Sequence, residues 1–561
     1  MERIENLLAE NIARLEETPS LDPLPPTAGS SPDDHVKVKS PKNVSVGRIY
    51  SVGYRLGDIN LFHGVPFLSL EGQRWIGFRT EESAAVRELG DSQRPLWQNQ
   101  LGAWPSMNGR DFTVHEHMPK LPPRTHVQQY FDAYRNSPVS SIFPIADPVL
   151  FPIVIGRAYG ENGKDRIDVA TAKACVFSFL AFVSAISNPD DGAFPVINIE
   201  ECLMGAEILF PDILNARART EVVDAMIMLA VYQFTHGHVQ TADVVLTLAS
   251  RFLYMLGAHL YPGEEVDGLP TKSPNLEIRT KLHQREMFWL CYTLDREITF
   301  RTGRPPIISD TSCDLVFPKY YSRQNAEGFR GLTRLPGDLG LSLIKSKAYE
   351  KLYSPHALRK PDAEILKDIR ELDDLLENWR QSLASETRPP LSFAQEAKQL
   401  PTKGLTIPSF MLRLEYHHCI TTIHQASSRC RNWSHDRLIN EGLSSSLDLA
   451  LEASRSLLSY LHFAEHLLVP NLFWIVIFYP ISAVLTLFCN ILLNPATESA
   501  STDAQSLREV LEFVETFLYR AQVFDRHLQH MKRLNEFIAE LVEMAGSAIE
   551  QVQRSPEGNT P

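Results

Sequence analysis

Histidine, cysteine and acidic side chains are the groups in this sequence that could do chemistry, and their spacing assigns no reaction to the chain. Of four close histidine pairs, only His527 and His530 have a spacing, i and i+3, that places both on one helix face. No cysteine or third ligand with metal-site spacing lies near them, so a polar helix face is favoured over a zinc site. The seven cysteines form no C-x-x-C pair, and no glycine-rich phosphate loop or G-x-S-x-G motif occurs. The sequence therefore predicts no catalytic, cofactor-binding or metal-binding residue, and it favours no enzyme.

The most informative stretch is REMFWLCYTLDREITFRTGRPPIISDTSCDLVFP, residues 285–318. Apolar residues recur at helical spacing in its first half, with Asp295 and Arg296 as charges inside that pattern. Because an unpaired charge is costly in apolar surroundings, we expect both to find partners. Gly303 is placed to end the helix, and the Pro-Pro pair that follows cannot continue it. The pattern predicts a buried helix, a stiff turn and an extended exit in which Asp310 and other aspartates suit turn or cap positions.

The elements that position this stretch are predicted to be helices. Across residues 121–548 apolar residues recur every three or four positions, and strand patterns are nearly absent. We therefore predict an all-α fold, one large multi-helix domain. The cleanest amphipathic helix is 361–383, whose stripe is expected to face the core, with a seam for another chain as the alternative. That stripe consists of Ile365, Ile369, Leu372, Leu376, Trp379 and Leu383.

Residues 472–493 are apolar over a length that could cross a membrane. Pro480 interrupts the middle, Asn490 lies inside the end, and the flanks lack the basic residues that would set an orientation. A buried core helix is expected, with a membrane span as the alternative.

The rest of the chain divides by composition into four segments. Residues 1–16 predict a short coiled-coil-like helix and 17–47 a disordered, proline-rich linker. Residues 48–120 predict an irregular lead-in, and 549–561 a disordered tail. The first helix carries a possible dimer seam, with a frayed amphipathic end as the alternative; the seam consists of Ile4, Leu8, Asn11 and Leu15.

The overall composition is that of a folded globular protein. The chain has 561 residues, 44% of them hydrophobic and 22% charged, which excludes a mostly disordered chain. Its net charge is 55 − 68 = −13, so the bulk of the protein is not expected to bind nucleic acid. Any contact with DNA would need a separate basic module.

The 285–318 string resembles the signature of the fungal-specific transcription factor regulatory domain, the middle homology region of zinc-cluster, xylanolytic-activator-like transcription factors. Residues 121–151, 242–262 and 473–495 look like further parts of that region, and the resemblance covers roughly 45–545. The signature is met by Arg285, Phe288, Trp289, Tyr292, Leu294, Asp295, Arg296, Gly303, Arg304, Pro305, Pro306, Ile308, Asp310, Asp314 and Pro318.

The resemblance implies a nuclear protein that regulates transcription by RNA polymerase II, with this chain as its regulatory or effector domain. It also implies a homo- or heterodimer, transcriptional co-regulators as partners and no membrane. The family binds DNA through a six-cysteine cluster that holds two zinc ions, and none of those ligands can be placed on this sequence. We therefore expect zinc only with an upstream cluster, and DNA contact only through a missing or partner-supplied module. The alternative is a DNA-binding-deficient co-regulator or helical scaffold that acts through a dimer partner.

Overall fold

The computed structural model describes residues 48–51, 54–59, 66–80 and most of 119–554. The gaps within that last range are 162–164, 187–195, 264–265, 267–271, 320, 322–335, 386, 394–405, 431–436, 469–471 and 521–524. The predicted helix 1–16 with its dimer seam, the predicted linker 17–47 and residues 81–118 lie outside the described residues.

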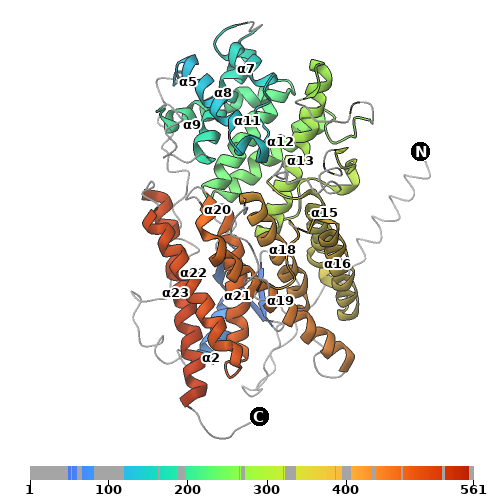
Figure 1. The fold of residues 1–561 in the computed structure, drawn as a ribbon, viewed down its shortest axis with the longest axis vertical. Coiled ribbons are helices and arrows are strands. Elements are labelled where there is room, and N and C mark those ends of the chain that lie inside the picture. The colour runs from blue at the N-terminus through green and yellow to red at the C-terminus, as the bar shows by residue number, and fades with distance from the viewer. Residues whose placement is uncertain are drawn as a thin grey trace, which may run out of the picture. The chain divides into compact units, whose positions relative to one another are not determined.

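A first group of helices surrounds one hydrophobic core between residues 124 and 302 (Figure 1). The apolar helix α8 packs against α7, α9 and α11, and α12 joins α11 to α13. The group comprises α5 (Arg124–Asn136), α6 (Val139–Ile142), α7 (Leu150–Ala158), α8 (Arg166–Ile186), α9 (Ile199–Ile208), α10 (Phe210–Asn215), α11 (Thr220–Thr235), α12 (Val239–Met255) and α13 (Leu276–Thr302), with the short 3-10 helix η5 (Asp310–Ser312) after it.

A second core joins the end of α13 to the elements that follow it. Phe300, near the end of α13, packs in this core with residues of the later helices. The elements are α15 (Leu339–Ala348), the π-helical turn η6 (Tyr349–Tyr353), η7 (Ala357–Arg359), α16 (Asp362–Ser382), α18 (Ile407–Gln425) and η8 (Ala426–Arg429).

A third core unites the first described residues with the C-terminal helices. It combines a small sheet and the helix after it with a bundle in which α21 lies between α19 and α22 (Figure 1). The elements are β1 (Arg48–Ser51), β2 (Tyr54–Ile59), β3 (Pro66–Leu68), α2 (Leu70–Thr80), α19 (Arg437–Ala464), η9 (Glu465–Leu467), α20 (Phe473–Val476), α21 (Phe478–Leu493), α22 (Glu498–Arg520) and α23 (Asp525–Arg554). The all-α prediction is confirmed, apart from this one small sheet.

The sheet corrects the prediction of an irregular lead-in over 48–120. The three strands pair antiparallel in the order β1-β2-β3, and α2 follows directly. At Gly72 an added Cβ would lie 1.9 Å from the Leu56 carbonyl oxygen, so only glycine lets α2 approach β2 this closely. The sequence pattern missed these elements because their stability comes from packing on α21 and α23, to which Trp75 and Ile76 contribute buried side chains.

The apolar stretch 472–493 divides into α20 and α21 and is buried within the third core. Pro480 falls in the first turn of α21, where a missing N–H costs no intrahelical bond. Among the described helices, α8 is the one long and apolar enough to cross a membrane. Because 78% of its most apolar 18-residue window is buried inside the domain, its pattern is typical of a core helix.

Two helix predictions can be compared directly with the structure. The 361–383 stripe is confirmed as core-facing, since five of its apolar residues are buried on α16 and the sixth, Leu383, is buried directly after it. The predicted tail from 549 is wrong for its first six residues, because α23 continues to Arg554.

A glycine marks the place where the first and third cores meet. Gly237, between α11 and α12, has φ of 78°, and a Cβ added there would lie 2.7 Å from the indole ring of Trp474 on α20. Gly257, after α12, has φ of 71° but open space around its Cβ position. Both glycines therefore need a left-handed backbone conformation, and only Gly237 also has a side chain, that of Trp474, in close contact.

We expect Gly237→Ala to lower stability more than Gly257→Ala. Both substitutions carry the left-handed backbone cost of roughly 1–2 kcal/mol. Gly237→Ala also displaces Trp474, which adds about 1–3 kcal/mol of overpacking. Urea unfolding of the two variants and the unchanged protein measures the difference, and equal losses would contradict the close contact between α20 and the α11–α12 turn.

Candidate functional site

Helix α13 carries the first half of the 285–318 stretch and is buried on nearly all sides. Its N-cap Asn275 accepts hydrogen bonds from the N–H groups of Glu277 and Ile278, and it ends at Gly303 with φ of 70°, as the sequence predicts. Twenty of its 27 residues are buried, including several charged ones. Those charges cannot be satisfied by water and must find partners inside the protein.

Arg285 joins α13 to two neighbouring backbone segments. Its guanidinium donates to the carbonyl oxygens of Ala258 and His259, at 3.2 and 3.0 Å, after the end of α12. It also donates to the carbonyl oxygens of Asp314 and Val316, the latter at 3.3 Å. One buried arginine thus satisfies backbone acceptors of two segments that also pair with each other, since the Asp314 N–H donates to the His259 carbonyl oxygen at 3.0 Å.

Asp295 and Arg296 hold the extended exit against α13, together with Asp310; we call these three residues the exit cluster. The Asp295 carboxylate accepts from the N–H groups of Ile307 and Ile308, at 2.9 and 3.0 Å. Arg296 donates to Asp295 at 2.5 Å, to Asp310 at 2.6 Å and to the Ile308 carbonyl oxygen at 2.7 Å. The expectation that both charges find partners is confirmed.

Asp310 lies at a turn position, as the sequence predicts, since it begins the short 3-10 helix η5. The Asp310 carboxylate accepts from Arg296, from Tyr292 at 2.9 Å and from Ser346 on α15 at 2.8 Å. The Asp314 carboxylate accepts from the N–H of Tyr261, after α12, at 3.0 Å. Both carboxylates therefore bind elements that are distant in the sequence.

The remaining signature residues complete the same packing. Arg304 pairs with Asp243 on α12, and the rings of Trp289 and Phe317 lie 5.7 Å apart. Phe288 and Pro318 are buried, whereas Pro305 is exposed and Pro306 is half-buried in the turn. The structure thus places the fifteen signature residues along α13 and its exit, where the contacts described above are those of a structural motif.

A second set of ionisable side chains lies at the C-terminal end of α13. We call Glu297, Arg301, Lys345, Glu415 and the neutral Tyr479 the junction network. Glu297 accepts from Arg301 at 3.0 Å, from Lys345 at 2.7 Å and from the Tyr479 hydroxyl at 2.7 Å. Lys345 also binds Glu415 at 2.9 Å. The network connects α13, α15, α18 and α21.

Arg301 extends the network to α20. Its guanidinium donates to the carbonyl oxygens of Trp474 and Ile475, at 3.2 and 2.6 Å. It also lies 4.6 Å from the ring centre of Phe234 on α11. The same side chain therefore touches the first and third cores.

The two carboxyls of the junction network have opposite pKa shifts. Burial raises the pKa of Glu415 to about 7, because Lys345 only partly offsets the lost hydration. Glu297 is also desolvated, but Lys345, Arg301 and the Tyr479 hydroxyl together hold its pKa well below the usual range. Next to them, burial lowers the pKa of His418 to about 3, so this imidazole is neutral.

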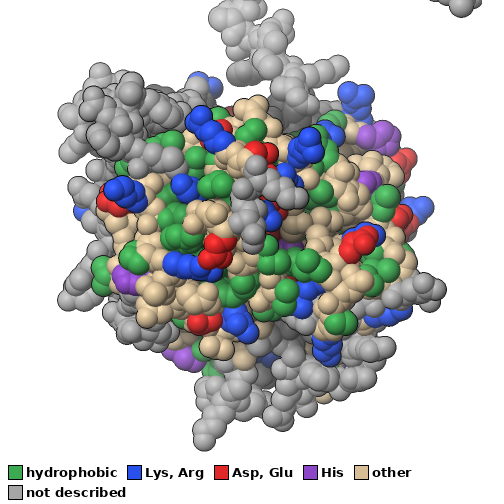
Figure 2. Space-filling model, turned by 90° about the horizontal axis from the view of Figure 1, so that it is seen from above, with side chains coloured by type: hydrophobic (Ala, Val, Ile, Leu, Met, Phe, Trp, Pro, Cys, Tyr) green, Lys and Arg blue, Asp and Glu red, His purple; other side chains and the backbone are tan. Residues whose placement is uncertain are grey.

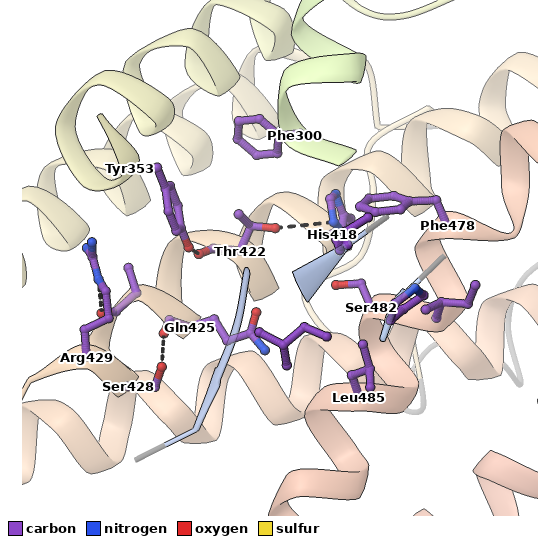
Figure 3. Close-up of a pocket in the computed structure, with 15 residues that line it drawn as sticks. Phe300, Tyr353, His418, Thr422, Gln425, Ser428, Arg429, Phe478, Ser482 and Leu485 are labelled. Carbon is purple, nitrogen blue, oxygen red and sulfur yellow. Dashed lines mark hydrogen bonds between the residues drawn. The ribbon is translucent and has the colours of Figure 1, made fainter. Parts of the chain in front are cut away.

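A cavity of about 60 Å³ lies beside the junction network (Figure 3); we call it the sheet cavity, because Ile49, Ile59 and Pro66 of the sheet line one side. Phe300 of α13 and the α18 residues His418, Thr422 and Gln425 line other parts of it. The remaining lining residues are Tyr353, Ala426, Ser428, Arg429, Phe478, Ile481, Ser482 and Leu485.

Sequence reasoning missed the junction network and the sheet cavity. Lys345 and Glu415 lie 48 and 118 positions after Glu297, so no local spacing pattern connects them. The available signal was a charge inside an apolar helical run, as at Glu415 in FMLRLEYHHCI.

The predicted histidine pair, His527 and His530, falls within α23, and the two side chains lie outside the described residues. Among the described residues, no three His, Cys, Asp or Glu side chains are grouped as metal ligands.

The described residues thus form a helical domain in which the signature residues hold α13, its exit segment and the neighbouring helices together. Part of this domain is similar to a known protein family. Residues 194–381 match the family described as the fungal specific transcription factor domain. This range contains α13 and the whole exit cluster.

The curated relatives point to the same class of protein. Two ABC-transporter-regulating transcription factors, from Aspergillus fumigatus and Aspergillus oryzae, are each 27% identical to the chain, over 357 and 360 residues. These alignments cover 60% of this chain and 37% of each relative, so the matched part spans just over a third of those proteins. The Fusaridione A cluster transcription factor of Fusarium heterosporum is 23% identical over 54% of this chain and 56% of that protein. Over these alignments the chain is therefore similar to fungal transcription factors, and residues 194–381 match a domain described for such proteins.

We expect Arg296→Ala to destabilise the domain strongly. Truncation leaves Asp295 buried without its cation, and breaking a buried ion pair in this way costs about 3–5 kcal/mol. The matched control is Arg554→Ala, which removes an exposed arginine paired with Glu550 and should cost roughly 0.5 kcal/mol or less. Thermal unfolding measures both, and Arg296→Lys, which keeps the charge, should fall between them. Unchanged melting of Arg296→Ala would show that the signature is not structural.

We expect Glu415→Gln to change how stability depends on pH. The pKa of Glu415 is about 7 in the folded protein, above the ordinary value of 4.5, so the folded state favours the protonated carboxyl. This contribution is present below about pH 4.5 and is lost as the pH rises to about 7. The unfolding free energy of the unchanged protein, relative to Glu415→Gln, should therefore fall by on the order of 1–3 kcal/mol between those values.

Urea unfolding at a series of pH values tests this expectation. Glu277→Gln, at an exposed carboxylate in the first turn of α13, serves as the control for the loss of one acidic side chain. A constant difference between the unchanged protein and Glu415→Gln across this range would refute the raised pKa.

Proposed function

We propose that this chain is the regulatory and effector part of a zinc-cluster-type fungal transcription factor that controls transcription by RNA polymerase II in the nucleus. The observation that carries the proposal is the family match over 194–381, whose signature residues build the centre of the fold around α13. The relatives named as transcription factors support the same reading.

In this proposal DNA is contacted by a separate module, in the whole protein or in a dimer partner. The chain carries a net charge of −13, which is unfavourable for binding phosphates over a broad surface. On the face shown in Figure 2, basic side chains are interspersed with acidic and apolar ones rather than gathered in a stripe. The helical domain then acts through proteins, as a homo- or heterodimer that binds transcriptional co-regulators. The seam of Ile4, Leu8, Asn11 and Leu15 is the proposed dimer contact.

A tethering experiment tests the proposal. The full chain, fused to an unrelated DNA-binding domain, is expected to change the output of a reporter with the matching binding site severalfold, upward or downward. Arg554→Ala should keep the effect, whereas Arg296→Ala should lose it because the domain no longer folds stably.

The contrary outcome is an unchanged reporter while the fusion is present in the nucleus and occupies the binding site. That result would reject an effector role. It would favour a helical scaffold without a direct transcriptional output.

A further inference from the structure

The interior around the junction network holds more carboxyls than cations. Its own carboxyls are Glu297 and Glu415, and the buried carboxyl of Asp338, the N-cap of α15, lies near Glu415. The cations of the network are Lys345 and Arg301. With all three carboxyls ionised, this interior would carry an excess negative charge, which is costly away from water.

The three carboxyls differ in the number of donors that stabilise their charge. Glu297 accepts three hydrogen bonds, as described above. Asp338 also accepts from three groups, whereas Glu415, among the described residues, accepts only from Lys345, at 2.9 Å. The donors to Asp338 are the N–H of Leu341 at 2.9 Å, the hydroxyl of Tyr321 at 2.8 Å and the indole N–H of Trp379 at 2.8 Å. Glu415 is therefore the carboxyl that most readily holds a proton.

Neutral titratable groups lie near Glu415 and its partners and do not balance its charge. Burial raises the pKa of Cys419, one turn further along α18, to about 12. The pKa of the Tyr479 hydroxyl on α21 is also raised by burial, and the imidazole of His418 is neutral. The charge of Glu415 thus depends on Lys345.

The charged groups on α16 and α19, which also pack against α18, have partners of their own. On α16, Arg380 and Glu377 bind each other at 2.7 Å. On α19, Arg455 pairs with Asp503 of α22 at 2.7 Å. Facing α19, Arg413 of α18 donates to the Tyr460 hydroxyl at 3.3 Å.

The Glu415 carboxylate lies next to a segment that water already reaches. Gly337, just before α15, is half-buried, and a Cβ added there would lie 3.7 Å from one of the carboxylate oxygens. An ionised Glu415 lacks donors in the closed packing, and a small separation of α18 from α15 would supply water instead.

We propose that release and uptake of a proton at Glu415 opens and closes the packing of α15 and α18 around α13. With the proton bound, two carboxylates face two cations, and the interior is balanced. When the proton passes to bulk solvent, the interior gains a negative charge. Opened conformations, in which water solvates the carboxylate, then become more populated.

The direction and size of the effect follow from the two pKa values of Glu415. The pKa is about 7 in the closed packing, and the ordinary value of 4.5 applies where water solvates the carboxyl. Opening is therefore least below pH 4.5, increases as the pH rises and levels off above about pH 7. For these values the opening constant rises about 40-fold between pH 5 and pH 7, and about fivefold of this falls between pH 6 and pH 7.

The switch gives the domain a means of control. The junction network connects α13, α15, α18 and α21, so its opening changes how these helices pack. Looser packing in turn alters the surface that the domain offers to co-regulators. This regulatory consequence rests on the proposed function, whereas the opening itself does not.

Hydrogen exchange of the purified full chain, from about pH 5 to about pH 8, tests the switch. After correction for the intrinsic pH dependence of exchange, protection in α15 and α18 is expected to fall about 40-fold between pH 5 and pH 7 and then level off. Glu415→Gln keeps the shape of the side chain but cannot ionise, so its profile should be flat. Glu277→Gln, at an exposed carboxylate, should behave like the unchanged protein.

Glu415→Met provides a second neutral variant in case Glu415→Gln does not fold, and its profile should also be flat. Protection that is independent of pH in the unchanged protein, or a fall that persists in both neutral variants, would overturn the proposal.

The tethered reporter separates the switch from the proposed function. If the switch controls the domain, Glu415→Gln, which is held closed, should change reporter output severalfold, whereas Glu277→Gln should not. A pH-dependent opening together with a silent reporter in all variants would reject the proposed function and leave the switch standing. An active reporter that is unaffected by Glu415→Gln would overturn the regulatory consequence.

Discussion

The fold depends on one constraint: charges placed inside an apolar helix must be neutralised by other parts of the same chain. Helix α13 carries Asp295, Arg296 and Arg301 at buried positions and Glu297 at a largely buried one, where water solvates them poorly. Each has a partner outside the helix, and these partners lie on the exit segment, α15, α20 and α21. The arrangement of the three cores around α13 therefore follows from electrostatics as much as from apolar burial.

Two consequences follow for a regulatory domain. Because buried charge networks require good geometry at every member, they fix the relative positions of the elements that contribute to them. The junction network does this for α13, α15, α18 and α21, and the sheet cavity lies directly beside it. A change in packing around His418 or Tyr479 is thus transmitted to a rigid set of helices.

The sequence predicted those features of the fold that depend on residue types a few positions apart. The end of α13 at Gly303, the buried stripe of α16 and the need of Asp295 and Arg296 for partners all follow from spacing and residue type. The small sheet was missed because it is stabilised by helices more than 400 residues away in the chain. The partners of Glu297 and the sheet cavity were missed for the same reason, since both are defined only by the meeting of distant elements. The turn position of Asp310 was predicted, whereas the partners of its carboxylate, Arg296, Tyr292 and Ser346, were not.

Hydrogen exchange at the backbone amides of Ile307 and Ile308 tests the central claim most directly. These two N–H groups lie in an extended segment with no helix or sheet partner, and they donate to the Asp295 carboxylate inside the protein. If the buried charges of α13 hold the fold together, both amides exchange as slowly as the backbone amides of the core helices α8 and α11. Exchange at the rate of an exposed loop would show that the exit segment opens freely from α13, and that these charges do not organise the domain.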